Sequence, residues 1–127
     1  MHASAQLLGR YLAELAQVTD EPGQLTRTFL SPAMRRANAL VATWMRAAGL
    51  ATREDTVGNL IGRLEAPTAS RARTLLLGSH LDTVRDAGRF DGALGVVLPI
   101  VALAELRRRG VTLPFAVEVL GFSEEEG

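Results

Sequence analysis

Two short apolar runs, joined by one long helical segment, constrain the fold of this chain more than any other feature. The runs cover residues 74–79 and 115–122, and each has the length and apolar content of a buried β-strand. Between them, residues 92–109 are apolar around nearly the whole girth, which predicts a helix buried against a sheet. Pro99 predicts a kink or a local break in that helix. A strand-helix-strand unit of this kind makes its two strands parallel, with a right-handed crossover.

The other segments complete an α/β fold with a mixed sheet. Residues 4–18 are expected to form an amphipathic helix, and Ser31-Pro32 is expected to open a second helix over residues 32–48. Residues 51–65 are expected to be β-like, with a turn near residues 57–59, and residues 66–73 to be a connector.

Composition limits the function classes. The 127 residues suit one domain, and the balance of 14 basic against 14 acidic residues argues against a nucleic-acid or membrane-surface partner. The chain has no cysteine, so any metal must be bound by His, Asp and Glu side chains. Without a signal-like start or an apolar stretch long enough to span a bilayer, a cytoplasmic protein is expected. His2, near the amino terminus, is expected to be disordered.

Metal-capable side chains follow both apolar runs. His80 and Asp82 come after the first run, Glu124, Glu125 and Glu126 after the second, and Asp91 precedes the helix. Because the carboxyl ends of parallel strands meet at one edge of a sheet, these groups are expected to converge although they are far apart in sequence. Three successive glutamates repel one another unless a cation is near or they reach solvent. The sequence therefore predicts part of a metal site.

The roles within such a site stay open at this level. Asp82 is placed either to hold the far nitrogen of a metal-bound His80 or to bind the metal itself. Asp91, framed by Gly88 and Gly92, has two oxygens with which to bridge two metals. In the glutamate run, one side chain can bind metal while its neighbour acts as a general base.

Ordinary structural interpretations compete with each of these assignments. A histidine after a strand is commonly a hydrogen-bonded loop residue, an aspartate before a helix is commonly its N-cap, and an acidic triplet is commonly a solvated loop. Each is the more frequent case by itself. It is their joint placement at one sheet edge that favours the metal site.

Three strings give the chain a resemblance to a known family: Gly78-Ser79-His80-Leu81-Asp82-Thr83-Val84, Gly88-Arg89-Phe90-Asp91-Gly92-Ala93-Leu94-Gly95 and Glu125-Glu126-Gly127. With Leu25-Thr26-Arg27, Phe29-Leu30-Ser31-Pro32 and Asp55-Thr56-Val57-Gly58-Asn59-Leu60 upstream, the chain resembles zinc-dependent amidases of the hydantoinase/carbamoylase type. These are N-carbamoyl-L-amino-acid hydrolases and allantoate amidohydrolases, within the aminoacylase/carboxypeptidase metallopeptidase superfamily. One departure is Ala87, which stands where a glycine is usual.

The resemblance implies a partial three-layer α/β/α zinc-peptidase-like catalytic domain and a dinuclear site. By it, His80 is a ligand of one metal, Asp91 the bridging carboxylate and Glu126 a ligand of the second metal. Glu125 is implied as the general base and Asp82 as the partner of His80. Two zinc ions are the implied cofactor, although manganese, cobalt or nickel suit the same ligands. The implied substrate is a small molecule with a linear amide or ureido bond.

Family members are much longer, so residues 1–127 are expected to be the amino-terminal part of the catalytic domain, without the dimerisation domain and the carboxyl-terminal part. Two further histidine ligands are expected beyond the chain. The chain alone is therefore expected to bind zinc weakly, to lack turnover, and to form a homo-oligomer or associate with the missing part. The alternatives are a dipeptidase or deacylase of the same superfamily, and a non-catalytic remnant or assembly module.

Overall fold

The computed structural model describes residues 2–68 and 73–127, whose helices and strands form an α/β fold. Residues 69–72 of the predicted connector lie outside the described residues. The elements, in chain order, are α1 (Ala3–Leu15), α2 (Pro32–Ala47), β1 (Ala51–Glu54), β2 (Leu60–Leu64), β3 (Thr74–His80), α3 (Ala93–Arg108) and β4 (Ala116–Phe122). No helix in these described ranges is long and apolar enough to cross a bilayer.

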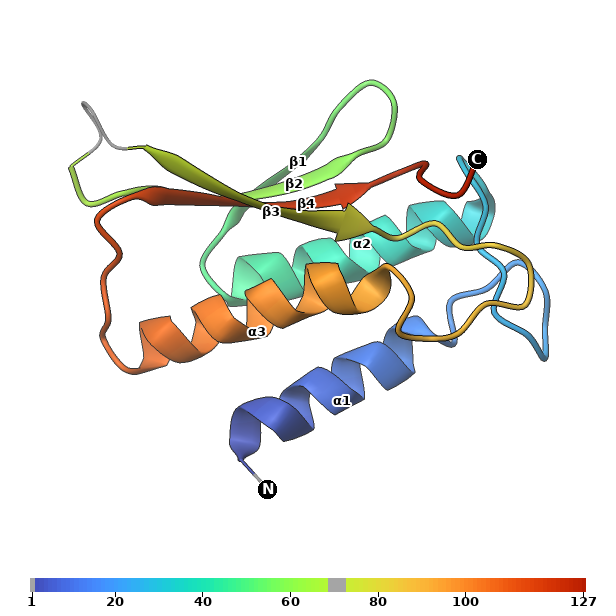
Figure 1. Ribbon diagram of the computed structural model, residues 1–127, viewed down its shortest axis with the longest axis horizontal. Helices are drawn as coiled ribbons and strands as arrows, with labels where there is room; N and C mark the ends of the chain where they lie inside the picture. Colours follow the sequence, from blue (N-terminus) through green and yellow to red (C-terminus); the bar gives the residue numbers. More distant parts are fainter. Residues whose placement is uncertain (1, 69–72) are drawn as a thin grey trace.

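The four strands form one mixed sheet in the order β1-β2-β4-β3. β3 and β4 are parallel, and β2 pairs with both β1 and β4 in antiparallel fashion. The register of the parallel pair runs from Thr74 opposite Ala116 to His80 opposite Phe122, so both strands end at the same level. Figure 1 shows the two arrowheads side by side, at the end of the molecule where the carboxyl terminus lies. The predicted strand-helix-strand unit is therefore confirmed.

The crossover helix α3 packs closely on β3. A Cβ atom at Gly95 would lie 2.6 Å from the Ser79 Cβ, so only glycine permits this approach. The helix continues through Pro99 without interruption, and the local break allowed for in the sequence analysis does not occur. Proline removes one helical hydrogen bond, but Val96, Val97 and Ile100 are at most 1% exposed in the core, and this burial keeps the helix in place.

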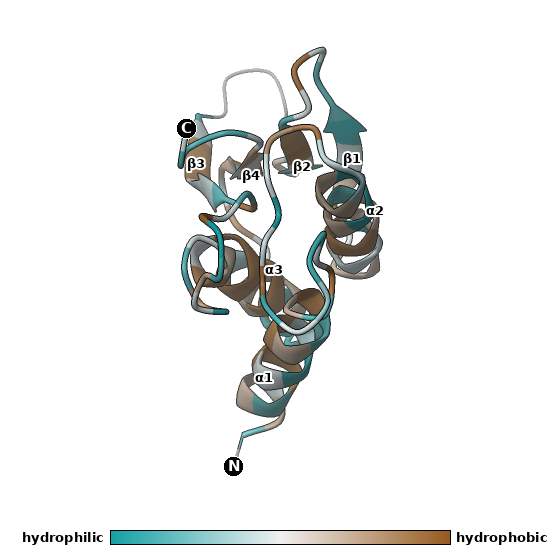
Figure 2. Ribbon diagram, turned by 90° about the vertical axis from the view of Figure 1, so that its right-hand side faces the viewer, coloured by the Kyte–Doolittle hydropathy of each residue, from teal (hydrophilic) through white to brown (hydrophobic). Residues whose placement is uncertain are grey.

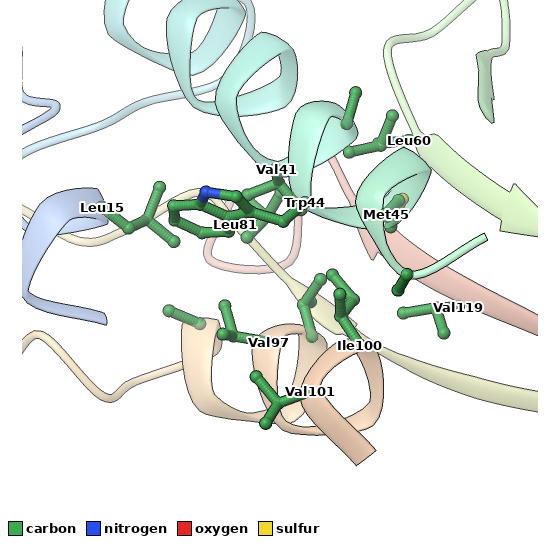
Figure 3. Packing of buried hydrophobic residues seen from close by; sticks show 14 of the residues in the cluster. Leu15, Val41, Trp44, Met45, Leu60, Leu81, Val97, Ile100, Val101 and Val119 are labelled. Atoms are coloured by element: carbon green, nitrogen blue, oxygen red, sulfur yellow. The ribbon is translucent and has the colours of Figure 1, made fainter. Parts of the chain in front are cut away.

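The helices form layers on one face of the sheet. α2 and α3 lie directly beneath the strands, and α1 packs on α3 on the side away from the sheet (Figures 1 and 2). Tyr11 of α1 stacks on Trp44 of α2 with ring centroids 4.1 Å apart. The shared core is shown in Figure 3, where Val97 and Ile100 face the side chains of α2 and the sheet.

The opposite face of the sheet has no helix over it among the described residues, and Leu76 and Phe122 are 58% and 42% exposed there. The fold is thus the partial α/β sandwich that the sequence predicted.

Local signals explain where the helices begin. Ser31 caps α2, its hydroxyl accepting a hydrogen bond from the Met34 amide at 3.0 Å, and Pro32 occupies the first turn as predicted. The expectation that His2 is disordered is wrong. Its ring accepts a hydrogen bond from the Ser4 amide at 3.3 Å and caps α1, because the first amides of a helix need acceptors.

Candidate metal centre

The carboxyl ends of β3 and β4 bring a histidine and three carboxylates together. The Nε2 atom of His80 lies 3.8 Å from Asp91 Oδ1, 3.7 Å from Glu125 Oε2 and 3.9 Å from Glu126 Oε1. One ligand atom each from His80, Asp91 and Glu126 all fall within 4.8 Å of one another. Figure 2 looks onto this edge of the sheet, where the loops after β3 and β4 lie side by side. The convergence predicted from topology is therefore present.

The His80 ring is held in one orientation by its immediate surroundings. Its Nδ1 atom lies 2.9 Å from the Asp82 carbonyl oxygen and 3.4 Å from Asp82 Oδ1. Two acceptors at Nδ1 favour the tautomer with the proton there, which leaves the Nε2 lone pair facing the carboxylates. Gly92 supports the same placement. It has φ +70°, and a Cβ atom there would lie 2.5 Å from the His80 ring and from the His80 carbonyl oxygen.

Asp82 links the two loops that carry the cluster. It is 2% exposed, and its Oδ2 atom accepts hydrogen bonds from the amides of Glu125 and Glu126, each at 3.0 Å. Its Oδ1 atom has no hydrogen-bond partner among the described residues and faces the His80 ring. The carboxylate is therefore on the Nδ1 side of the imidazole, opposite the Nε2 side where the other carboxylates gather.

The remaining acidic residues differ in exposure. The side chains of Asp91 and Glu125 are 57% and 59% exposed, whereas that of Glu126 is 23% exposed. Asp91 is not the N-cap of α3, because Gly92 occupies that position and makes no side-chain capping bond. That competing structural interpretation of Asp91 is thus wrong. Glu124 is exposed and lies outside the cluster of ligand atoms.

The donor set fits a divalent metal ion. A zinc ion binds nitrogen and oxygen ligands at about 2.0–2.1 Å, so two ligand atoms of one ion lie at most about 4.2 Å apart. The distance of 3.8 Å from His80 Nε2 to Asp91 Oδ1 falls within that limit, so these two atoms fit one ion. A lone pair and several carboxylate oxygens facing one another repel unless a cation lies between them. The nearby Arg85 does not supply it, since its guanidinium pairs with Glu21.

Several residues that support the cluster were given no role in the sequence analysis, although Asp55 and Asn59 lie in a string quoted there for the resemblance. Asn59 Oδ1 accepts hydrogen bonds from the Ser123 amide at 2.9 Å and the Ser123 hydroxyl at 3.2 Å, which fixes the start of the glutamate run. Asn59 is itself held by Asp55, whose side chain accepts from the amide and the side-chain nitrogen of Asn59. The turn is visible in the sequence, but its partner Ser123, directly after β4, is 64 residues away. The role of Arg27, described below, likewise depends on a contact with a distant part of the chain, the Leu81 carbonyl.

The fold and the cluster together define the class of domain, an α/β domain with metal-capable side chains gathered at one sheet edge, and comparison with known proteins identifies its family. The model of peptidase family M28 matches residues 59–127, more than half of the chain, and the chain belongs to that family.

The individual relatives that the chain matches have more specific names than the family model. The chain is 51% identical over 118 residues to allantoate deiminase 2 of Glycine max, covering 91% of this chain and 24% of that protein. It is 44% identical over 121 residues to the N-carbamoyl-L-amino acid amidohydrolase of Geobacillus stearothermophilus, covering 94% of this chain and 29% of that protein.

A solved structure supports the same relationship. The fold matches a hydantoinase/carbamoylase family amidase from Burkholderia ambifaria with a TM-score of 0.89 and 37% identity, covering 98% of this chain and 30% of that one. The resemblance seen in the sequence motifs is confirmed. The chain covers 24–30% of the length of these relatives.

Proposed function

We propose that this chain carries part of the dinuclear metal centre of an amidohydrolase that cleaves linear amide or ureido C–N bonds. The observation that carries the proposal is the cluster of His80, Asp91 and Glu126 at the carboxyl edge of the β3-α3-β4 unit. The proposed substrates are N-carbamoyl-L-amino acids or allantoate-like ureido compounds, because the relatives are named for those reactions.

The proposed ligand roles are those that the resemblance implies. His80 would hold one metal through Nε2, Glu126 would hold the second and Asp91 would be shared by both, and the clustering of these three side chains supports these roles. Zinc is the proposed metal, and manganese, cobalt or nickel suit the same nitrogen and oxygen donors. Metal ions at such a site polarise the scissile carbonyl and make water a better nucleophile at neutral pH.

Glu125 and Asp82 have different tasks in this proposal. Glu125 takes a proton from the attacking water and passes it to the leaving nitrogen, so that its carboxylate is regenerated when the C–N bond breaks. Its main chain is held by Asp82, while its side chain is free to reach substrate. Asp82 keeps the proton of the imidazole on Nδ1 and so keeps Nε2 available as a ligand.

Calorimetric titration of the chain with zinc tests the metal site. Asp91→Ala is expected to weaken zinc binding at least tenfold, because it removes the shared ligand. Glu14→Ala is the matched control, since it removes an exposed carboxylate from α1, far from the cluster in sequence. A folded chain that binds no zinc, or that binds it equally well after Asp91→Ala, would refute the proposal.

A chimera tests the reaction and the substrate class. The corresponding segment of the Geobacillus stearothermophilus amidohydrolase is replaced by residues 1–127 of this chain. We expect hydrolysis of an N-carbamoyl-L-amino acid or of allantoate, lost on Glu125→Gln. Hydrolysis of N-acyl amino acids or dipeptides only would assign the chain to a deacylase or dipeptidase instead. A folded, metal-loaded chimera without any of these activities would support a non-catalytic role.

A further inference from the structure

The loop that joins β3 to α3 is held along its length by residues 19–27, a segment that makes no strand or helix of its own. We propose that Arg27, at the end of this segment, is a positioning residue of the metal centre, and we call residues 19–27 the brace. The inference rests on the proposed metal site, because positioning is meaningful only if His80 and its partners bind a metal.

Arg27 is a buried cation whose hydrogen bonds go to main-chain carbonyls. It is 1% exposed, and its Nε donates to the Leu81 carbonyl at 2.8 Å. One terminal nitrogen donates to the carbonyls of Leu15 at 3.0 Å and Val18 at 2.7 Å. These last two carbonyls lie at and just beyond the end of α1, where helical acceptors are left free and a positive charge is favoured. Arg27 thus ties the end of α1 to the residue after β3.

The charge of Arg27 is retained despite its burial. Burial lowers the pKa of the guanidinium to about 10, against the opposing effect of Asp20 and Asp82, so the group stays protonated at neutral pH. Burying such a group is costly unless its donors are satisfied. The carbonyls of Leu81, Leu15 and Val18 satisfy three of its five N–H donors, and losing these bonds would leave buried donors without partners.

Leu81 is the point at which the brace acts on the metal centre, because it lies between His80 and Asp82. Its amide donates to the Phe122 carbonyl at 3.2 Å, its carbonyl accepts from Arg27, and its side chain is fully buried. With both polar groups and the side chain held, the flanking peptides cannot rotate freely. The directions in which His80 and Asp82 leave the chain are fixed as a result.

Further hydrogen bonds continue the brace along the loop. The Thr83 amide donates to the Arg27 carbonyl at 2.8 Å, and the Arg27 amide donates to the Thr83 hydroxyl oxygen at 2.8 Å. The Ala87 amide donates to the Leu25 carbonyl at 2.8 Å, and the Asp86 amide donates to the Thr26 hydroxyl oxygen at 3.1 Å. These hydrogen bonds hold the loop in place, although it forms no helix or strand of its own.

The brace lies outside the region that the family model matches, which begins at residue 59. The β-α-β unit carries the ligands, whereas the brace is supplied by an earlier part of the chain. We therefore expect changes in the brace to alter metal affinity without touching any ligand.

The test uses three brace variants and two matched controls. Arg27→Met removes the charge and all three hydrogen bonds to carbonyls. Arg27→Lys keeps the positive charge but lacks the planar guanidinium that donates to several carbonyls at once. Thr26→Val removes the hydroxyl that accepts from the Asp86 amide. Arg46→Lys and Thr43→Val make the same chemical changes at exposed sites on α2. Zinc affinity of the folded chain is measured by calorimetry, cobalt coordination by visible absorption, and unfolding by urea. Amide hydrogen exchange at Thr83, Glu125 and Glu126 is measured without metal.

Loss of a group that orients a ligand typically costs tenfold to a hundredfold in metal affinity. We expect Arg27→Met to weaken zinc binding by about that factor, to change the cobalt spectrum and to speed exchange at the three amides. Arg27→Lys and Thr26→Val should show smaller effects in the same direction, and the controls none.

Unchanged zinc affinity and unchanged exchange in folded brace variants would overturn the inference, even if the free energy of unfolding fell. If Arg27→Met does not fold, Arg27→Lys and Thr26→Val decide by the same criteria. If the proposed function is wrong, the result is different: the unaltered chain binds no zinc, while Arg27→Met still speeds exchange at the three amides.

Discussion

Two substitutions of Asp82 separate the hydrogen bonds of its carboxylate from its negative charge. Asp82→Ala removes both. Asp82→Asn keeps one oxygen that can accept from the amides of Glu125 and Glu126, but it removes the charge beside His80. Asp86→Asn is the matched control, since Asp86 is exposed and its φ of +54° is one that asparagine tolerates.

The magnitudes follow from the contacts. A hydrogen bond to a charged group contributes about 1.5–3 kcal/mol. Two such bonds are lost in Asp82→Ala, but Glu125 is 59% exposed and water replaces part of what is lost. We expect a cost of about 2–3 kcal/mol in the free energy of unfolding. For Asp82→Asn we expect less than about 1 kcal/mol, because its one oxygen keeps both bonds and an uncharged amide nitrogen takes the buried position of the unpartnered Oδ1.

The effects of the two substitutions on zinc affinity should differ from their effects on stability. Both variants remove the carboxylate that favours the Nδ1 proton of His80, so both should bind zinc about tenfold or more weakly. Urea unfolding followed by circular dichroism gives the stabilities, and calorimetry gives the affinities. Equal destabilisation by Asn and Ala would show that charge, not the two amide bonds, holds the loops together. Unchanged zinc affinity in both would refute the orienting role of Asp82.

Three further predictions concern other parts of the same edge. Gly92→Ala should lower the free energy of unfolding, measured in urea, by more than about 3 kcal/mol, because it combines the backbone strain of a positive φ, about 1–2 kcal/mol, with a steric clash against the His80 carbonyl. Gly110 also has a positive φ, +69°, but open space around it, so Gly110→Ala should cost only the strain. Hydrogen bonds from Thr26, Gln24 and Arg85 lower the pKa of Glu21 to about 2 from 4.5, so its contribution to stability is complete above pH 4.5 and is lost as the pH falls toward 2. The difference in unfolding free energy between the unaltered chain and Glu21→Gln should therefore shrink over that range, and a difference that stays constant would contradict the assignment. Adding a chelator to the zinc-loaded chain should lower the melting temperature, and the same treatment of Asp91→Ala at the same zinc concentration should lower it less.

The regular elements of the fold were predictable because their signals are local. Apolar periodicity and the Ser31-Pro32 start place α2 within one residue of its observed end, and the apolar runs place β3 and β4 equally closely. The first helix was predicted to reach Val18 but ends at Leu15. Its last turn is replaced by a segment whose carbonyls bind Arg27, and this contact depends on tertiary structure that no local pattern contains.

The composition of the cluster was likewise predictable, whereas its supports were not. A topological rule is enough to bring His80, Asp91 and Glu126 to one edge, because it needs only the order of strands and helix. Whether Asp82 faces the metal side or the far side of the imidazole depends on one backbone turn. The structure places its Oδ2 on two amides of the glutamate run, 43 and 44 residues away.

The two loops that carry the proposed ligands form no helix or strand of their own, so side chains outside them must hold them in a fixed conformation. Arg27 holds the loop after β3 through Leu81, and Asn59 holds the start of the loop after β4 through Ser123. Asp82 then joins one loop to the other. A metal would add a second connection, through His80 on one loop and Glu126 on the other. Binding should therefore be strongest when Arg27, Asn59 and Asp82 have already fixed both loops, because the ordering entropy is then lost on folding rather than on binding.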